Sequence, residues 1–185
     1  MRIRRLQKLI LLTRLKWNIP ILAGLAKHHS CGFNKLANEL NISKDSLNTS
    51  IKFLNRHNFV KKTRNAYNPR YTQYSLNNLT TSCINNCLNF YNQITNHKHF
   101  DTIFRRWSLP VIILLNQKNH NFSELKNTLP GITSRALSQN TKKLMLTKII
   151  TRKVKSSFPP TTLYILSNSG KNVYEKINNF YLTLA

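Results

Sequence analysis

The sequence predicts a mainly α-helical fold with small β-hairpin wings, arranged as two tandem winged helix-turn-helix units. Three observations carry this prediction: the chain repeats itself, each repeat changes from helical to strand periodicity at the same place, and cations far outnumber acids. Lys and Arg total 29 against 5 Asp and Glu, a formal net charge of +24. We place the first unit, with a connecting helix, at residues 1–94 and the second at residues 95–185.

The clearest sign of repetition is the pair of tryptophans, Trp17 and Trp107, which lie 90 positions apart in similar basic segments. The same offset, after one slip of a single residue, relates the apolar positions of the two copies. These pairs are Ile42/Ile132, Leu47/Leu137, Leu54/Leu144, Val60/Ile150, Tyr74/Tyr164 and Leu76/Leu166. We interpret the pattern as a duplicated unit.

Three helices are expected in each copy. A buried helix follows the tryptophan at residues 19–25 and 109–115, where the chain is apolar. A short amphipathic helix comes next, and in the second copy Asn121 and Glu124 fit a capping box. Ser43 and Thr133 are suited to cap the N-terminus of the third helix. The third helix buries Leu47, Ile51 and Leu54 in copy one, and Leu137 and Leu144 in copy two.

Strand periodicity follows the third helix in both copies. Residues 60–64 and 71–76 predict a hairpin around Asn68-Pro69, and residues 149–154 and 161–166 predict another around Pro159-Pro160. A long helix over residues 77–100 is expected to join the copies, with a counterpart at residues 168–182. Two helices, a tight turn and a basic hairpin are the order of a winged helix-turn-helix.

The third helix of each copy supplies the candidates for reading DNA bases, because that helix enters the major groove. Its exposed positions are Lys44, Asn48, Thr49, Ser134, Arg135, Ser138 and Gln139. Arg135 suits guanine, and Asn48 or Gln139 suits adenine. Asp45 counts against the first copy, because phosphate repels a carboxylate. The alternative interpretation is a solvated helix face.

Further cations are expected to contact the DNA backbone, which positions a protein without reading sequence. They lie on the third helices and on the hairpins: Lys52, Lys61, Lys62, Arg64, Arg70, Lys142, Arg152, Lys153 and Lys155. The alternative for the hairpins is a basic edge strand, since lysines also deter strand-to-strand aggregation.

Catalysis, metal binding and membrane insertion find little support. Four glycines make no phosphate-binding loop, five acids leave little for paired-carboxylate chemistry, and the histidines form no nucleophile–base order. We therefore expect no enzyme, cofactor or metal, with Cys31, Cys83 and Cys87 as reduced packing thiols. Because no apolar run approaches roughly 20 residues, we expect no membrane partner. The expected location is the cytoplasmic nucleoid, or an organelle nucleoid if the Asn-rich composition reflects an AT-rich organelle genome.

The second copy carries Arg106-Trp107 before an apolar helix, the segments 122–125 (FSEL) and 130–139 (PGITSRALSQ), and then Tyr164, Leu166 and Gly170. In these residues it resembles the HxlR-type winged-helix regulators. The first copy is similar but lacks the Pro-Gly before its third helix. The resemblance implies transcriptional regulation, usually by a homodimer. Some members sense oxidants through a cysteine shortly before the tryptophan, and neither copy has one there.

The leading hypothesis is a sequence-selective DNA-binding transcriptional regulator whose partner is double-stranded DNA. Because one chain carries both heads, it is expected to act as a monomeric pseudo-dimer, and the sequence leaves a homodimer open. Two alternatives remain. One is an architectural binder of the nucleoid or of RNA, which uses charge and little sequence. The other is a winged-helix protein-interaction module with only the second copy on DNA.

Overall fold

The computed structural model describes residues 2–64, 71–77, 83–156 and 160–184, and within them one order of elements occurs twice. The first half contains α1 (Arg2–Leu12), α2 (Asn18–His28), β1 (Ser30–Gly32), α3 (Phe33–Leu40), α4 (Lys44–Arg56), β2 (Val60–Arg64) and β3 (Thr72–Leu76). Two connecting helices follow, α5 (Ile84–Ile94) and α6 (Phe100–Ile103). The second half contains α7 (Ser108–Gln117), β4 (His120–Asn121), α8 (Phe122–Thr128), α9 (Ser134–Leu146), β5 (Ile150–Lys155), β6 (Thr161–Leu166) and α10 (Asn168–Thr183).

The helix boundaries follow the capping residues. Ser43 accepts a hydrogen bond from the Ser46 amide at 3.3 Å and begins α4, and Thr133 accepts one from the Ala136 amide at 3.1 Å and begins α9. Asn121 and Glu124 form the reciprocal capping box of α8, with both hydrogen bonds at 2.8 Å. These side chains satisfy amide groups that the first turn of a helix leaves without partners. The three caps confirm the predicted starts of these helices.

Each half closes with a three-stranded antiparallel sheet, in the order β1-β3-β2 and β4-β6-β5. The third strands, β1 and β4, were not expected from the sequence. They are only three and two residues long, and each pairs with a strand more than 40 residues later, so local periodicity does not reveal them. The predicted turn residues Asn68, Pro69 and Pro159 lie outside the described residues.

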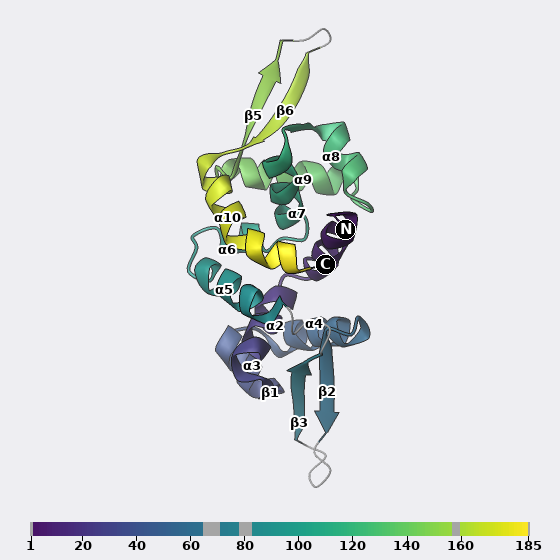
Figure 1. The fold of residues 1–185 in the computed structure, drawn as a ribbon, viewed down its shortest axis with the longest axis vertical. Helices are drawn as coiled ribbons and strands as arrows, with labels where there is room; N and C mark the ends of the chain where they lie inside the picture. Colours follow the sequence, from purple (N-terminus) through teal and green to yellow (C-terminus); the bar gives the residue numbers. More distant parts are fainter. Residues whose placement is uncertain (1, 65–70, 78–82, 157–159, 185) are drawn as a thin grey trace.

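The two halves meet through helices that run across the middle of the molecule, while the hairpins point away from each other at its two ends (Figure 1). Helix α5 packs on α10, and α1 packs on α7 and α10 of the second half. Phe90 of α5 is fully buried between Phe104 and Phe180, with ring centroids 5.8 Å and 6.1 Å away. One hydrophobic core therefore continues from one half into the other.

The predicted helix over residues 77–100 is wrong in its extent. Helix α5 ends at Ile94, and the chain turns through residues 95–99 before the short α6. This turn consists of Thr, Asn, His and Lys, and three of these types are weak helix formers. The turn also lets Phe100 pack against Trp17 and Phe104, with centroids 6.3 Å and 4.6 Å away. Tertiary packing of an aromatic ring thus outweighs continuation of the helix.

A buried Asn–Ser hydrogen bond joins α7 to α9 in the second half. In the second half the Asn140 amide of α9 donates to the Ser108 hydroxyl of α7 at 3.0 Å, and both side chains are buried. In the first half the two residue types are exchanged, with Asn18 on α2 and Ser50 on α4, again both buried. The equivalent positions thus keep buried Asn and Ser residues with the two types exchanged, but within the described residues neither side-chain polar atom of Asn18 makes a hydrogen bond.

Candidate nucleic-acid interface

The base-reading candidates lie on α4 and α9, and all of them are exposed. One face of α4 packs into the core through Leu47, Ile51 and Leu54. One face of α9 does so through Leu137 and Leu144. The opposite faces carry Lys44, Asn48, Thr49 and Lys52 on α4, and Ser134, Arg135, Ser138, Gln139 and Lys142 on α9. Asp45 is exposed in the first turn of α4, where the helix dipole favours a negative charge.

The wing candidates lie on the strands that follow these helices. Lys61, Lys62 and Arg64 are exposed on β2, and Arg152, Lys153 and Lys155 are exposed on β5. The Arg152 guanidinium donates to the Thr162 hydroxyl across the hairpin at 3.2 Å. Arg70 lies outside the described residues. Both wings thus present cations to solvent, as a backbone contact would need.

Two pockets at equivalent positions flank the N-terminal parts of α4 and α9. The pocket beside α9 has a volume of about 380 Å³, and the pocket beside α4 has a volume of about 270 Å³. Each lies between the residues around a tryptophan, Trp107 or Trp17, and the third helix of its half. Lys16 lines both pockets. The two candidate reading helices therefore border on one shared side chain.

Lys16 contacts one acid on α6 and the ring of the neighbouring tryptophan. Its ammonium lies 2.6 Å from the carboxylate of Asp101 and 4.6 Å from the centroid of the Trp17 ring. At the equivalent place in the second half, the guanidinium of Arg106 lies 4.7 Å from the Trp107 centroid. Such cation–π contacts attract the charged end of a long side chain to the face of the ring.

Lys16, Arg105 and Arg106 were not among the candidates predicted from the sequence. The basic segment before each tryptophan could have indicated these residues. Periodicity alone does not predict that this segment lies beside the third helix.

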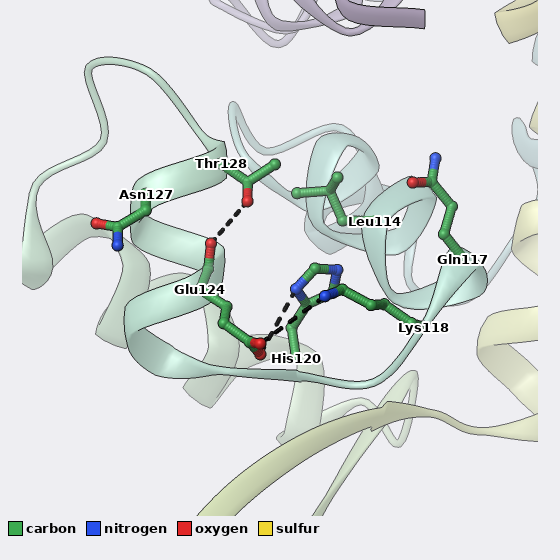
Figure 2. Close-up of a pocket in the computed structure, with 7 residues that line it drawn as sticks. All are labelled: Leu114, Gln117, Lys118, His120, Glu124, Asn127 and Thr128. Atoms are coloured by element: carbon green, nitrogen blue, oxygen red, sulfur yellow. Dashed lines mark hydrogen bonds and ion pairs between the residues drawn. The ribbon is translucent and has the colours of Figure 1, made fainter.

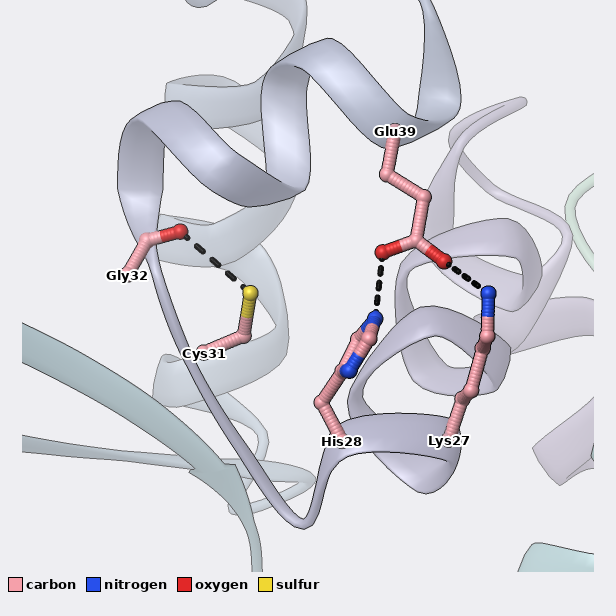
Figure 3. Close-up of polar contacts among 5 residues, drawn as sticks. All are labelled: Lys27, His28, Cys31, Gly32 and Glu39. Carbon is pink, nitrogen blue, oxygen red and sulfur yellow. Dashed lines mark hydrogen bonds and ion pairs between the residues drawn. The ribbon is translucent and has the colours of Figure 1, made fainter.

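The acids Glu39 and Glu124 tie the first helix of each helix-turn-helix to the elements before it. Glu39 of α3 lies 2.7 Å from the Lys27 ammonium and 2.6 Å from His28 Nε2 (Figure 3). Partial burial acts to raise the pKa of Glu39, but its hydrogen bonds with Lys27 and His28 outweigh burial and lower that pKa.

Glu124 lies in the first turn of α8 in the second half, beside a cleft of about 520 Å³ (Figure 2). Its carboxylate lies 3.8 Å from Lys118 Nζ and 3.8 Å from His120 Nδ1. The hydrogen bond from the Asn121 amide is the main cause of the lowered pKa of Glu124. Both acids thus serve local structure at the side of the helix-turn-helix.

All three cysteines are buried. Cys83 and Cys87 lie at the start of α5, and Cys31 lies on β1. Burial raises the pKa of the Cys87 thiol well above its usual range, which disfavours the reactive thiolate. Within the described ranges, no group of three or more His, Cys, Asp or Glu side chains is placed to hold a metal ion. The same part of the chain contains no helix long and apolar enough to span a membrane.

Comparison with known proteins agrees with this geometry. The family model of the HxlR-like helix-turn-helix matches residues 102–182. The chain is 31% identical over 74 residues to the uncharacterized HTH-type transcriptional regulator YvaP of Bacillus subtilis (strain 168), an alignment that covers 40% of this chain and 68% of the relative. It is 32% identical over 68 residues to an uncharacterized HTH-type transcriptional regulator of Methanothermobacter thermautotrophicus, covering 37% of this chain and 52% of that one.

Among solved structures, a MarR-family transcriptional regulator from Enterococcus faecalis V583 is 26% identical, with a TM-score of 0.43, over 46% of this chain and 78% of that one. The matched family region begins at α6 and runs through α10, so it contains the helix-turn-helix formed by α8 and α9 and the hairpin of β5 and β6. On these grounds, the chain belongs to the HxlR-like helix-turn-helix family.

Proposed function

We propose that this chain is a sequence-selective DNA-binding transcriptional regulator that uses both α4 and α9 as reading helices. The observation that carries the proposal is the repeated geometry: two capped, exposed third helices border the same lysine, and each is followed by a basic hairpin. The formal net charge of +24 supports a polyanionic partner, because phosphate neutralisation releases counterions. A nucleoid location is part of the proposal.

One chain carries two heads, and we propose that it acts as a pseudo-dimer. A helix-turn-helix dimer reads two half-sites about 34–36 Å apart, one helical turn of DNA. The packing of α5 on α10 and of α1 on the second half supports a fixed relation between the heads within one chain. The exchanged Asn and Ser residues of the two cores support an origin by duplication. Because the heads differ in sequence, the preferred DNA site is an imperfect inverted repeat.

Selection of bound duplexes from a random pool tests the function. The proposal expects two unequal half-sites separated by about one helical turn. A single half-site favours the alternative in which only the second half contacts DNA, an alternative that Asp45 in the first turn of α4 supports. No enrichment of any sequence, despite binding that weakens steeply with salt, favours the architectural alternative.

Arg135 gives the sharpest prediction about base reading. Arg135→Ala is expected to cost about 1–3 kcal/mol on the selected duplex and to relax the preference at one base position, because an exposed arginine in this place suits a guanine edge. Lys142→Ala, on the same helix, is the matched control and is expected to weaken binding to all duplexes alike. Competition binding with single-base variants of the duplex measures both. A loss of affinity from Arg135→Ala that is equal for every variant would contradict base reading by this residue.

A further inference from the structure

The pocket beside α9 is strongly cationic. Lys16, Arg105 and Arg106 line it together with Gln139 of the reading helix, and both arginines are exposed. Lys16 is already paired with Asp101, whereas neither Arg105 nor Arg106 forms an ion pair with an acidic side chain of the described residues, so the two guanidinium groups supply the positive charge of the pocket. Gln139 places the pocket directly beside the face that α9 presents for DNA.

The equivalent pocket beside α4 has lost this charge. At an offset of 90 residues, Leu15 stands where Arg105 stands in the second half, and Lys16 stands where Arg106 stands. Asp45 also lines the pocket beside α4, whereas its counterpart by the same offset is Arg135. Among the described residues that line the first pocket, Lys16 is therefore the one cation, it is already paired with Asp101, and Asp45 adds a negative charge.

We propose that the pocket beside α9 binds a backbone phosphate of the DNA, and that the pocket beside α4 does not. This inference rests on the proposed function and adds to it a site that anchors one head. Guanidinium groups bind phosphate oxygens through charge-assisted and often bidentate hydrogen bonds. The Trp107 ring holds Arg106 in place, so little side-chain freedom is lost on binding. A carboxylate in the first pocket repels the same phosphate.

A phosphate in this position sets how α9 enters the groove. The pocket shares Gln139 and Asn140 with α9, so a bound phosphate lies within a helical turn of the candidate base contacts. It also lies on the side of α9 that faces the other half, because Lys16 belongs to the first half. The anchored phosphate is therefore on the inner side of the second half-site, toward the centre of the DNA site.

The test compares Arg105→Leu with the wild-type chain on a duplex of about 30 base pairs, long enough for two half-sites. Leucine is the residue that the first half carries at this position, so the substitution is tolerated by an equivalent fold. We expect an affinity loss of about tenfold or more and a salt dependence shallower by about 0.9 in the log–log slope. Arg105→Lys keeps the charge and is expected to restore most of the slope. Lys171→Leu, an exposed cation on α10 that lines neither pocket, is the control for charge alone.

The reverse substitution tests the proposed difference between the pockets. Leu15→Arg combined with Asp45→Arg gives the first half the residues that the second half carries at these two positions, adds a guanidinium to the first pocket and removes its carboxylate. We expect a steeper salt dependence by about one phosphate contact. An unchanged slope for this variant would overturn the inequality of the pockets. Wild-type affinity and slope for Arg105→Leu would overturn the phosphate site. If the wild-type chain bound no duplex at all, the result would instead contradict the proposed function itself.

Discussion

Phe90→Ala is expected to lower the free energy of unfolding by about 3–5 kcal/mol, the range found when a fully buried phenylalanine is truncated. Phe90 lies on α5 with no exposed surface, and its ring contacts Phe104 and Phe180. Phe90 lies at the junction between the halves. Its truncation leaves a cavity there, and rearrangement of side chains within one half alone would not fill it. Denaturation in urea, followed by circular dichroism, measures the change.

Leu182→Ala is the matched control for this junction. Leu182 lies on α10 near Phe180, but 46% of its surface is exposed. Its truncation is expected to cost less than about 1 kcal/mol, because little apolar area is lost from the core. If Phe90→Ala also stayed within about 1 kcal/mol of the wild-type chain, α5 and α10 would not form the stabilising contact between the halves.

Gly170→Ala is expected to cost about 3 kcal/mol of stability through steric overlap. A β-carbon at this position would lie 2.2 Å from the carbonyl oxygen of Ile149 and 2.6 Å from a methyl group of Leu166. The Ile149 oxygen cannot move aside easily, because it accepts hydrogen bonds from the amide and the hydroxyl of Ser167. Helix α10 would therefore have to shift and lose the cap that Ser167 gives to the Gly170 amide.

Gly131→Ala separates steric overlap from backbone strain. Gly131 has a φ of +79°, and a β-carbon there would meet no atom within 4 Å. Only the strain of a positive φ remains, about 1–2 kcal/mol. Thermal unfolding of both variants compares the two effects. A smaller loss for Gly170→Ala than for Gly131→Ala would contradict the close approach of α10 to the turn before β5.

Much of the fold could be predicted because its signals are local. Ser43, Thr133 and the capping box of Asn121 with Glu124 mark helix starts within three residues of sequence, and the structure has all three. The buried third-helix positions were also predicted correctly, since their spacing alone indicates a helix face. Repetition added to this signal, because each copy supports the interpretation of the other.

The features that the sequence did not predict depend on residues far apart in the chain. The short strands β1 and β4 exist only through pairing with β3 and β6. The end of α5 at Ile94 depends on a site for the Phe100 ring against Trp17. The position of the Lys16 side chain depends on its ion pair with Asp101, which lies 85 positions later in the chain. Such pairs lie too far apart for a local sequence pattern to reveal them. The pocket beside α9, which Lys16 of the first half helps to line, could therefore not be predicted.

The stoichiometry of the DNA complex tests most directly whether one chain acts as a two-headed unit. Sedimentation of the chain with the selected duplex, over a range of protein concentrations, measures the mass of the complex. We predict one chain of 21.6 kDa for each duplex, because the packing of α5 on α10 already joins the two proposed reading helices in that chain. A complex that forms only with two chains on each duplex would contradict the account.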